Sequence, residues 1–470
     1  MREKFFIVFM TLFMLFFSAC GSVSSDSSET NSTQLNNPSE SQTIGDVVFE
    51  ETTVQIPTLV VIMNWTDYSE NNPQVWYDKI FNKNANSVNR WYYDSSDANI
   101  ELVPVNENSG ISNDGIVTVG MNEAHPGGYS DISFRDTQIK NAIESFTVNS
   151  AIDFKSYDTN GDGGISRSEM QIIFIVAGGE ESYGDSTSNS IWAHSWSFES
   201  NKAPKLDDVY LMRAASTTAA SGNYSKFGAT HSIGRIDEHK ASIGIIAHEL
   251  GHSLFNLEDL YNDSYGHSGL GYYDIMSGGS WGRKTIDDYE GDTPTQFSAY
   301  SKIDTGINTD IVTITPTSSG KEIVLKCSSN EYLKLTTASS DEYFLLECRD
   351  SARVDSDRTF YTLDSTFTEN RLFALLYHVD ENKFSSTALA NREEGTQSTT
   401  NHYAVRLVER DTSFSLTSTD GVKAKFSDAY TQGQTIDSEK TKSYSGTLGY
   451  NILVDSSDYA NRTMTFKITR

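Results

Sequence analysis

Apolar residues along the first half of the chain alternate between two patterns. Short continuous runs of β-branched and aromatic residues are typical of strands buried on both faces. Apolar residues that recur three and four positions apart indicate helices instead. We therefore expect strands at residues 58–63, 100–103, 115–119 and 171–177, and helices near 73–81, 87–93, 134–146, 241–255 and 295–303.

The pattern changes after residue 309. Short apolar segments, each long enough for one strand, are separated there by polar turns: DIVTITP, EIVLKC, EYLKLTT, EYFLLECRD, LFALLYHVD, HYAVRLVER, YNILVD and MTFKIT. Many short strands with turns between them predict a β-rich, sandwich-like region over residues 310–470. The fold class that we predict is therefore α+β, with the mixed region first and the β-rich region behind it.

The N-terminus has the pattern of an export signal. A short basic start precedes an apolar run from Phe5 to Phe17, which is shorter than the ~20 residues of a membrane-spanning helix. Small residues before Cys20 are typical of a bacterial lipoprotein cleavage site. We predict a signal peptide over residues 1–20 with a lipid on Cys20. The alternative is an ordinary signal peptide cut near Ala19.

Composition narrows the classes of partner. Residues 21–55 are rich in Ser, Thr and Asn, contain acids and lack Lys and Arg, which predicts a disordered tether. The whole chain has a formal net charge of −28, which excludes a nucleic-acid partner and leaves the lipid on Cys20 as the only expected membrane contact.

Three cysteines are too few for a disulfide scaffold. Outside the cell, a disulfide between Cys327 and Cys348 is favoured over two buried thiols.

The strongest chemical signal is His248-Glu249-Leu250-Gly251-His252. Two histidines four residues apart on a helix direct both imidazoles from one face, where one zinc ion can bind them. Glu249 follows the first of them and is placed to take a proton from water at the metal. Asn256 can end the helix in a left-handed conformation. The chain can then turn back and offer a third ligand from the segment Leu257–Tyr261.

A second metal motif lies at residues 158–169. Asp158, Asn160, Asp162 and Glu169 stand at positions 1, 3, 5 and 12 of a twelve-residue calcium loop, and Gly164 can offer its carbonyl at position 7. The segment after the loop predicts a strand, so we do not expect the two helices of an EF-hand. We expect Ca²⁺ to be structural here, the alternative being a turn without metal.

Longer segments resemble one family. HELGHSLFNLEDLY, GYYDIMSGGSWG and TPTQFSAYSKIDTG, together with IWAHSW and EYFLLECRD, resemble the immune inhibitor A family of bacterial zinc metallopeptidases. The resemblance implies a zincin-type catalytic domain, His248 and His252 as zinc ligands, Glu249 as the general base, and Met276 in a turn below the metal. The family usually has Pro at position 258. With Glu258 there, we favour Asp259 as the third ligand, with Glu258 and His267 as alternatives.

These observations combine into one prediction. Residues 56–309 form a zincin-type domain and residues 310–470 the β-rich domain of an exported, lipid-anchored zinc endopeptidase that cleaves proteins or peptides. The oxyanion donor is open among Tyr272, Tyr273 and His267. We expect a monomer at the outer membrane or cell surface, with release from the cell as an alternative. The rival hypothesis is a catalytically inert, calcium-stabilised surface binding protein on a protease-like fold.

Two further histidines are candidate metal ligands, but a simpler interpretation is favoured for both. His194 and His378 are each expected to be hydrogen-bonded within a strand or beside aromatic rings. Asp380 and Glu381 offer a further place for a cation, and His402 has no partner that the sequence reveals.

Overall fold

The computed structural model describes residues 53–127, 131–184, 189–215, 222–233, 236–261, 269–283, 287–307, 309–315, 320–351, 372–383, 402–410, 428–447 and 449–470. Residues 51–470 form one compact unit. The predicted signal peptide, Cys20, nearly all of the tether and His267 lie outside the described residues. Within them, no helix is both long and apolar enough to cross a membrane. The predicted boundaries between the four segments of the chain stay predictions.

An eight-stranded mixed sheet organises the first half of this unit. Its central strand, β1 (Val54–Asn64), pairs in parallel with β2 (Ile100–Pro104), β3 (Ile116–Gly120) and β4 (Gln171–Glu180). β4 pairs in parallel with β9 (Tyr224–Ile233) and with the short β5 (Ser190–Ile191). Two strands, β6 (His194–Trp196) and β10 (Ile236–Lys240), run antiparallel to β9. A separate pair is β7 (Lys205–Leu206) with β8 (Val209–Tyr210).

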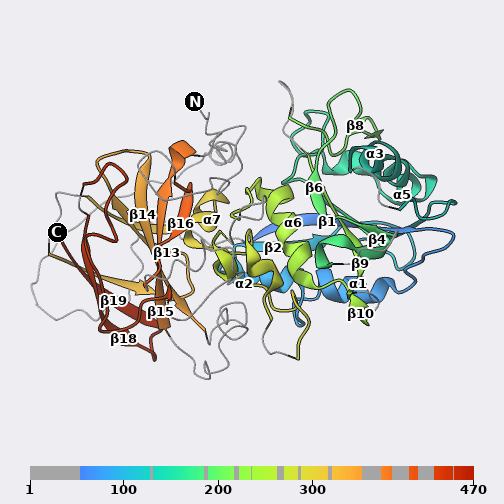
Figure 1. Cartoon of the computed structure of the whole chain (residues 1–470). Helices are drawn as coiled ribbons and strands as arrows, with labels where there is room; N and C mark the ends of the chain where they lie inside the picture. Colours follow the sequence, from blue (N-terminus) through green and yellow to red (C-terminus); the bar gives the residue numbers. More distant parts are fainter. Residues whose placement is uncertain are drawn as a thin grey trace, which may run out of the picture. The chain divides into compact units, whose positions relative to one another are not determined.

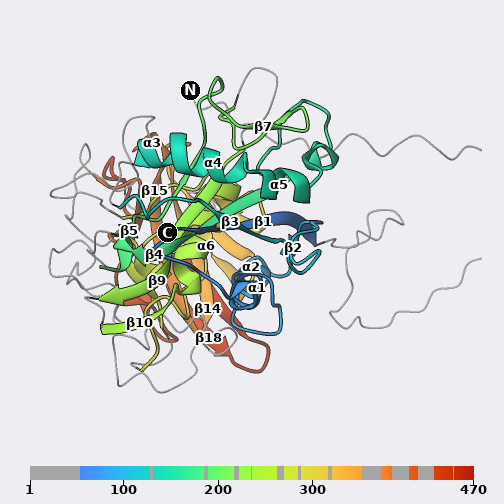
Figure 2. The same ribbon diagram turned by 90° about the vertical axis from the view of Figure 1, so that its right-hand side faces the viewer.

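Alternate residues of one strand point to opposite faces of a sheet, and residues of both kinds are buried here. Both faces of this sheet are therefore covered. Val60 and Ile62 of β1 join one hydrophobic core, whereas Val61 and Met63 join another. The first core includes residues of α1 (Pro73–Ile80), α2 (Val88–Ser95) and α6 (Ile243–Phe255). The second includes residues of α3 (Asp131–Phe134), α4 (Lys140–Ile143) and α5 (Phe146–Ala151). Figure 2 shows these two groups of helices on opposite faces of the sheet.

The helix predicted over residues 134–146 is wrong in its extent. A π-helical turn, Arg135–Ile139, separates α3 from α4, and the chain leaves the helical conformation at Ser145. The Ser145 side chain accepts a hydrogen bond from the Val148 amide and starts α5. The segment is therefore two helices with a cap between them. The helix predicted at 295–303 is also shorter, as α7 (Ala299–Asp304).

The predicted C-terminal strands are present and form two sheets. One has the order β11 (Asp310–Ile314), β13 (Glu331–Thr336), β14 (Glu342–Asp350), β15 (Leu372–Asp380), β16 (Val405–Leu407), and the other the order β12 (Lys321–Lys326), β19 (Thr463–Thr469), β18 (Asn451–Asp458), β17 (Thr435–Ile436). Side chains of both sheets share one core. A disulfide joins Cys327 to Cys348, with the two Cα atoms 4.4 Å apart.

The C-terminal strands also pack against the first half of this unit. β14 and β15 lie among the C-terminal strands (Figure 1), and every residue of the two strands is buried. Phe344 and Leu346 face the core between the two C-terminal sheets, whereas Tyr343 and Leu345 join the core that contains α6. The β-rich region therefore covers part of the core that supports the helix carrying the two histidines.

Candidate metal centre

Helix α6 carries His248 and His252 and is almost completely buried. Its residues from Ile243 to Gly251 are all buried, as the apolar sequence predicts for a helix inside a core. Asn256 ends the helix with φ 60°, and its amide bonds to the carbonyls of Gly251 and His252. This is the left-handed helix end that the sequence predicts. It sends the chain back along the helix, towards the histidines.

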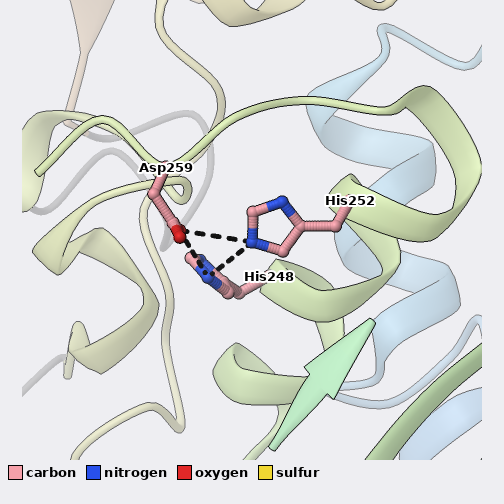
Figure 3. A group of neighbouring side chains, drawn as sticks. All are labelled: His248, His252 and Asp259. Atoms are coloured by element: carbon pink, nitrogen blue, oxygen red, sulfur yellow. Dashed lines mark hydrogen bonds and ion pairs between the residues drawn. The ribbon is translucent and has the colours of Figure 1, made fainter. Parts of the chain in front are cut away.

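The returning chain brings Asp259 to the two imidazoles. The Asp259 Oδ1 atom lies 3.2 Å from the Nε2 atom of His248 and 3.2 Å from that of His252. The two Nε2 atoms are themselves 3.2 Å apart. Figure 3 shows the three side chains converging on one point from the helix and from the loop after it. Among the described residues, these three form the one group of His, Cys, Asp and Glu close enough to share an ion.

The other nitrogen of each imidazole faces a backbone carbonyl. His248 Nδ1 lies 2.8 Å from the Ile275 oxygen, and His252 Nδ1 lies 2.7 Å from the Leu257 oxygen. A carbonyl only accepts hydrogen bonds, so each Nδ1 carries the proton. When both rings are neutral, their Nε2 lone pairs point towards each other and towards a carboxylate oxygen. Three electron-rich atoms at this spacing repel one another unless a proton or a cation lies between them.

The turn below the two imidazoles is fixed by Asp274. This carboxylate is fully buried and accepts hydrogen bonds from the Met276 amide at 2.6 Å and the Ser298 amide at 2.9 Å. A Cβ on Gly251 would lie 2.5 Å from the Met276 sulfur, so only glycine allows this close approach. The Met276 carbonyl in turn accepts a hydrogen bond from the Leu260 amide, next to Asp259.

The charges around the site follow from burial and proximity. Burial alone would lower the pKa of His252, but the Asp259 carboxylate raises it to about 9. Burial would raise the pKa of Asp259, and the adjacent histidines hold it well below its usual value. Burial raises the pKa of Glu249, and the charges of His248 and His252 partly offset this. In the metal-free molecule, the site therefore holds a proton on His252 at neutral pH.

Other predicted site residues are placed differently. Glu258 is not part of the three-residue group, and His267 lies outside the described residues. The Tyr273 hydroxyl donates to Asp428 at 2.9 Å within the core, so it is engaged away from the predicted oxyanion role. Burial raises the pKa of Tyr272 to about 12, which keeps its phenol protonated as a donor. Among the described residues Tyr272 stays a candidate oxyanion donor, and His267 stays a prediction.

The calcium-loop residues form a closed turn before β4. Asp158 accepts hydrogen bonds from the Asp162 amide at 3.1 Å and the Gly163 amide at 3.1 Å. Glu169 accepts them from the amides of Thr159, Asn160 and Ser166. Gly163, at position 6, has φ 81°, which suits glycine. The carboxylates of the loop thus contact backbone amides, and the strand after the loop, β4, is as predicted.

The remaining histidine predictions concern His194 and His378. His194 Nε2 lies 3.1 Å from the Tyr224 hydroxyl, beside the Trp196 ring. His378 Nε2 lies 2.8 Å from a Glu342 oxygen. Both are structural histidines within the described part of the chain, as expected.

Comparison with known proteins shows the family to which the chain belongs. The family described as "Immune inhibitor A peptidase M6, catalytic domain" matches residues 67–308. The chain belongs to this family of metallopeptidases, as the sequence motifs predict. Among individual proteins, it is similar to Immune inhibitor A of Bacillus thuringiensis subsp. alesti, with 31% identity over 172 residues. That match covers 35% of this chain and 23% of the relative.

The sequence did not single out several residues that position this centre. Asp274 stands inside the quoted GYYDIM segment, and Arg349 inside EYFLLECRD, but neither segment shows what its charged residue contacts. Ser225, Ser253 and Gln171 form a buried hydrogen-bonded chain behind α6 that ends on the Glu249 carbonyl. Small polar residues in apolar segments were the available signal, because buried polar groups need partners.

Proposed function

We propose that this protein is a zinc-dependent endopeptidase, with His248, His252 and Asp259 as the ligands and Glu249 as the general base. The spacing of the three donor atoms is the main support. Ligands about 2.0–2.1 Å from a tetrahedral zinc lie about 3.3–3.4 Å from one another. The three donors here are 3.2 Å apart in every pair. Two neutral imidazoles and one carboxylate are also a donor set that zinc prefers and that leaves a fourth position open.

The roles of the side chains follow from the same geometry. When bound, zinc would supply a Lewis acid that acidifies water and polarises the scissile carbonyl. Glu249 takes the proton released as the new C–O bond forms, and delivers it to the amine as the C–N bond breaks. Its raised pKa suits this exchange. The Ile275 and Leu257 carbonyls hold the two imidazoles in the tautomer that binds metal.

The finer description of the fold is part of the proposal. The mixed sheet beside a buried helix that carries both histidines supports a zincin-type domain. The core shared by the two C-terminal sheets supports a sandwich-like arrangement of that region. Protein or peptide substrates follow from the family. No described feature supports the rival hypothesis of an inert binding protein.

Casein hydrolysis tests the proposed chemistry. We expect Glu249→Gln to lower kcat/KM by about 10²–10⁴-fold while zinc content stays unchanged, because the general base is lost and the ligands remain. Glu258→Gln is the matched control, since it changes a nearby acid outside the three-residue group, and should retain activity. A zinc chelator should abolish cleavage by the wild type. Undiminished cleavage by Glu249→Gln would refute this mechanism.

We also propose that Asp158, Asn160, Asp162, Gly164 and Glu169 bind a structural Ca²⁺ ion. The complete loop motif supports this, and binding would have to draw together carboxylates that accept hydrogen bonds from backbone amides without the ion. Calcium should raise the melting temperature of the wild type by roughly 5 °C at saturating concentration. Asp162→Ala should lose that increase, whereas Asp208→Asn, an exposed acid outside the loop, should keep it. An equal calcium response in Asp162→Ala would rule out the loop.

Export and anchoring rest on the N-terminal sequence. We propose that the residues before Cys20 are removed and that Cys20, as the new N-terminus, carries the lipid that holds the enzyme at the outer membrane or cell surface. Residues 21–55 would then act as the tether. Cys20→Ser should release the protein from the membrane fraction, and its retention there would contradict a lipid at this position.

A further inference from the structure

The backbone segment from Tyr273 to Met276 supports all three proposed zinc ligands. Its Ile275 carbonyl faces His248 Nδ1 at 2.8 Å. Its Met276 carbonyl accepts from the Leu260 amide at 2.7 Å, and so holds the loop that carries Asp259. The Met276 side chain packs against Gly251, next to His252 in α6. A displacement of this segment would therefore reach each ligand.

Arg349 holds this segment from the C-terminal region. It belongs to β14, and its guanidinium is fully buried. Arg349 Nη2 donates to the Tyr273 carbonyl at 2.7 Å and lies 3.4 Å from the Phe297 carbonyl. Phe297 precedes Ser298, whose amide donates to Asp274. One guanidinium thus joins the two backbone stretches that Asp274 also joins.

The charge of Arg349 is balanced inside the core. Its Nε and Nη2 atoms lie 3.0 Å and 2.8 Å from Glu347 Oε1, and the Tyr377 hydroxyl donates to the same oxygen. A buried ion pair is weak evidence for stability, because desolvation offsets much of the attraction. The planar set of donors on the guanidinium, however, fixes the direction of the hydrogen bonds in a way that a lysine cannot reproduce. This favours a role in geometry.

We propose that Arg349 is a positioning residue through which the β-rich region orients the metal centre of the catalytic domain. The inference rests on the proposed zinc site. It makes the C-terminal region part of the catalytic apparatus, because β14 supplies the guanidinium that fixes the Tyr273–Met276 segment. The residue acts through the backbone and does not contact substrate or metal.

Arg349→Lys tests this directly. It keeps the positive charge but loses the fixed fork, so we expect the zinc dissociation constant to rise and kcat to fall, each roughly tenfold, with KM nearly unchanged. The absorption spectrum of the cobalt-substituted protein should also change, since the ligand geometry shifts. Arg462→Lys is the matched control. Arg462 pairs with Asp350, also on β14, and within the described part of the chain no hydrogen bond or ion pair joins it to the Tyr273–Met276 segment, so zinc binding should be unchanged.

The outcomes separate positioning from general stability. If Arg349→Lys melts cooperatively but keeps wild-type zinc affinity and kcat, or if Arg462→Lys weakens zinc binding equally, the proposal is overturned. Should Arg349→Lys not fold, Arg349→Met with Glu347→Gln removes the ion pair without leaving a buried charge, and the same two constants decide. If the wild type binds zinc without cleaving peptides, the proposed function fails, and the zinc constants still test Arg349.

Discussion

Two regions of this molecule combine histidines with carboxylates, and only one of them forms a candidate metal site. In the catalytic half, His248 and His252 both direct Nε2 at one oxygen of Asp259. In the C-terminal half, His378 Nε2 faces Glu342 at 2.8 Å, and His402 Nε2 faces Asp380 at 2.8 Å. The second region therefore contains two separate pairs.

An aromatic ring keeps those C-terminal pairs apart. The Tyr444 ring stacks on His378 with centroids 4.1 Å apart and on His402 with centroids 3.3 Å apart. Both Asp380 oxygens are engaged, one by His402 and the other by Asn382. Glu381 accepts from the Tyr343 hydroxyl. The comparison shows that residue types alone do not define a metal site: the lone pairs must converge on one point.

Removing one histidine from each region should give the largest contrast. His252→Gln should reduce zinc from about one ion per chain to background and abolish hydrolysis, because two ligands cannot hold a tetrahedral site. His402→Gln should keep full zinc content and lose only stability. Elemental analysis of purified protein measures both. Zinc retained by His252→Gln, or lost from His402→Gln, would break the comparison.

Changing one carboxylate in each region should give a smaller effect. Asp259→Asn replaces the charged ligand by a neutral amide, so zinc affinity should fall about a hundredfold. Asp380→Asn should leave zinc affinity within about twofold, since it is not part of the converging group. Competition with a chromogenic chelator gives both constants. If Glu258→Gln weakens zinc binding and Asp259→Asn does not, the third ligand must be reassigned.

In the metal-free protein, the histidines of the two regions should make the free energy of unfolding change with pH in opposite directions. The pKa of His252 is raised from 6.5 to about 9, so its stabilisation is complete below pH 6.5 and is lost as pH rises through 9. Burial, only partly offset by the Glu342 hydrogen bond, lowers the pKa of His378 to about 4. Over this range the unfolded chain binds a proton on His378 and the folded protein does not, so the fold loses stability as pH falls from 6.5 towards 4.

Urea unfolding of chelator-treated protein at pH 5, 6.5 and 9 measures the loss of stability at high pH (the alkaline limb) and the loss at low pH (the acid limb). His252→Gln should flatten the alkaline limb, and His378→Gln should reduce the acid limb. Zinc should also remove the alkaline limb, because bound imidazoles are already neutral. An alkaline limb that is the same in wild type and His252→Gln would show that another group causes it.

Much of the fold was predictable from local pattern. Apolar runs identified β1, β4, β14, β15 and α6, because these segments are buried on nearly every side. Shorter apolar segments between polar turns identified most of the other C-terminal strands. The helix predicted over residues 134–146 is helical as far as Ile143 and then ends, because the Ser145 cap starts a separate helix there. Strands β9 and β10 were not predicted. Their residues mix polar and apolar types, and their strand form depends on pairing with β4 and with each other.

The part of the site that one helix contains follows from local sequence pattern. Four-residue spacing places two imidazoles on one face, Asn256 ends the helix behind them, and the family follows from motifs along the chain. Tertiary structure decided the rest: that Asp259 meets both Nε2 atoms, that two backbone carbonyls set the tautomers, and that Arg349 supports the turn beneath. Those contacts join residues distant in sequence or held in loops, and local spacing does not specify how separate elements pack.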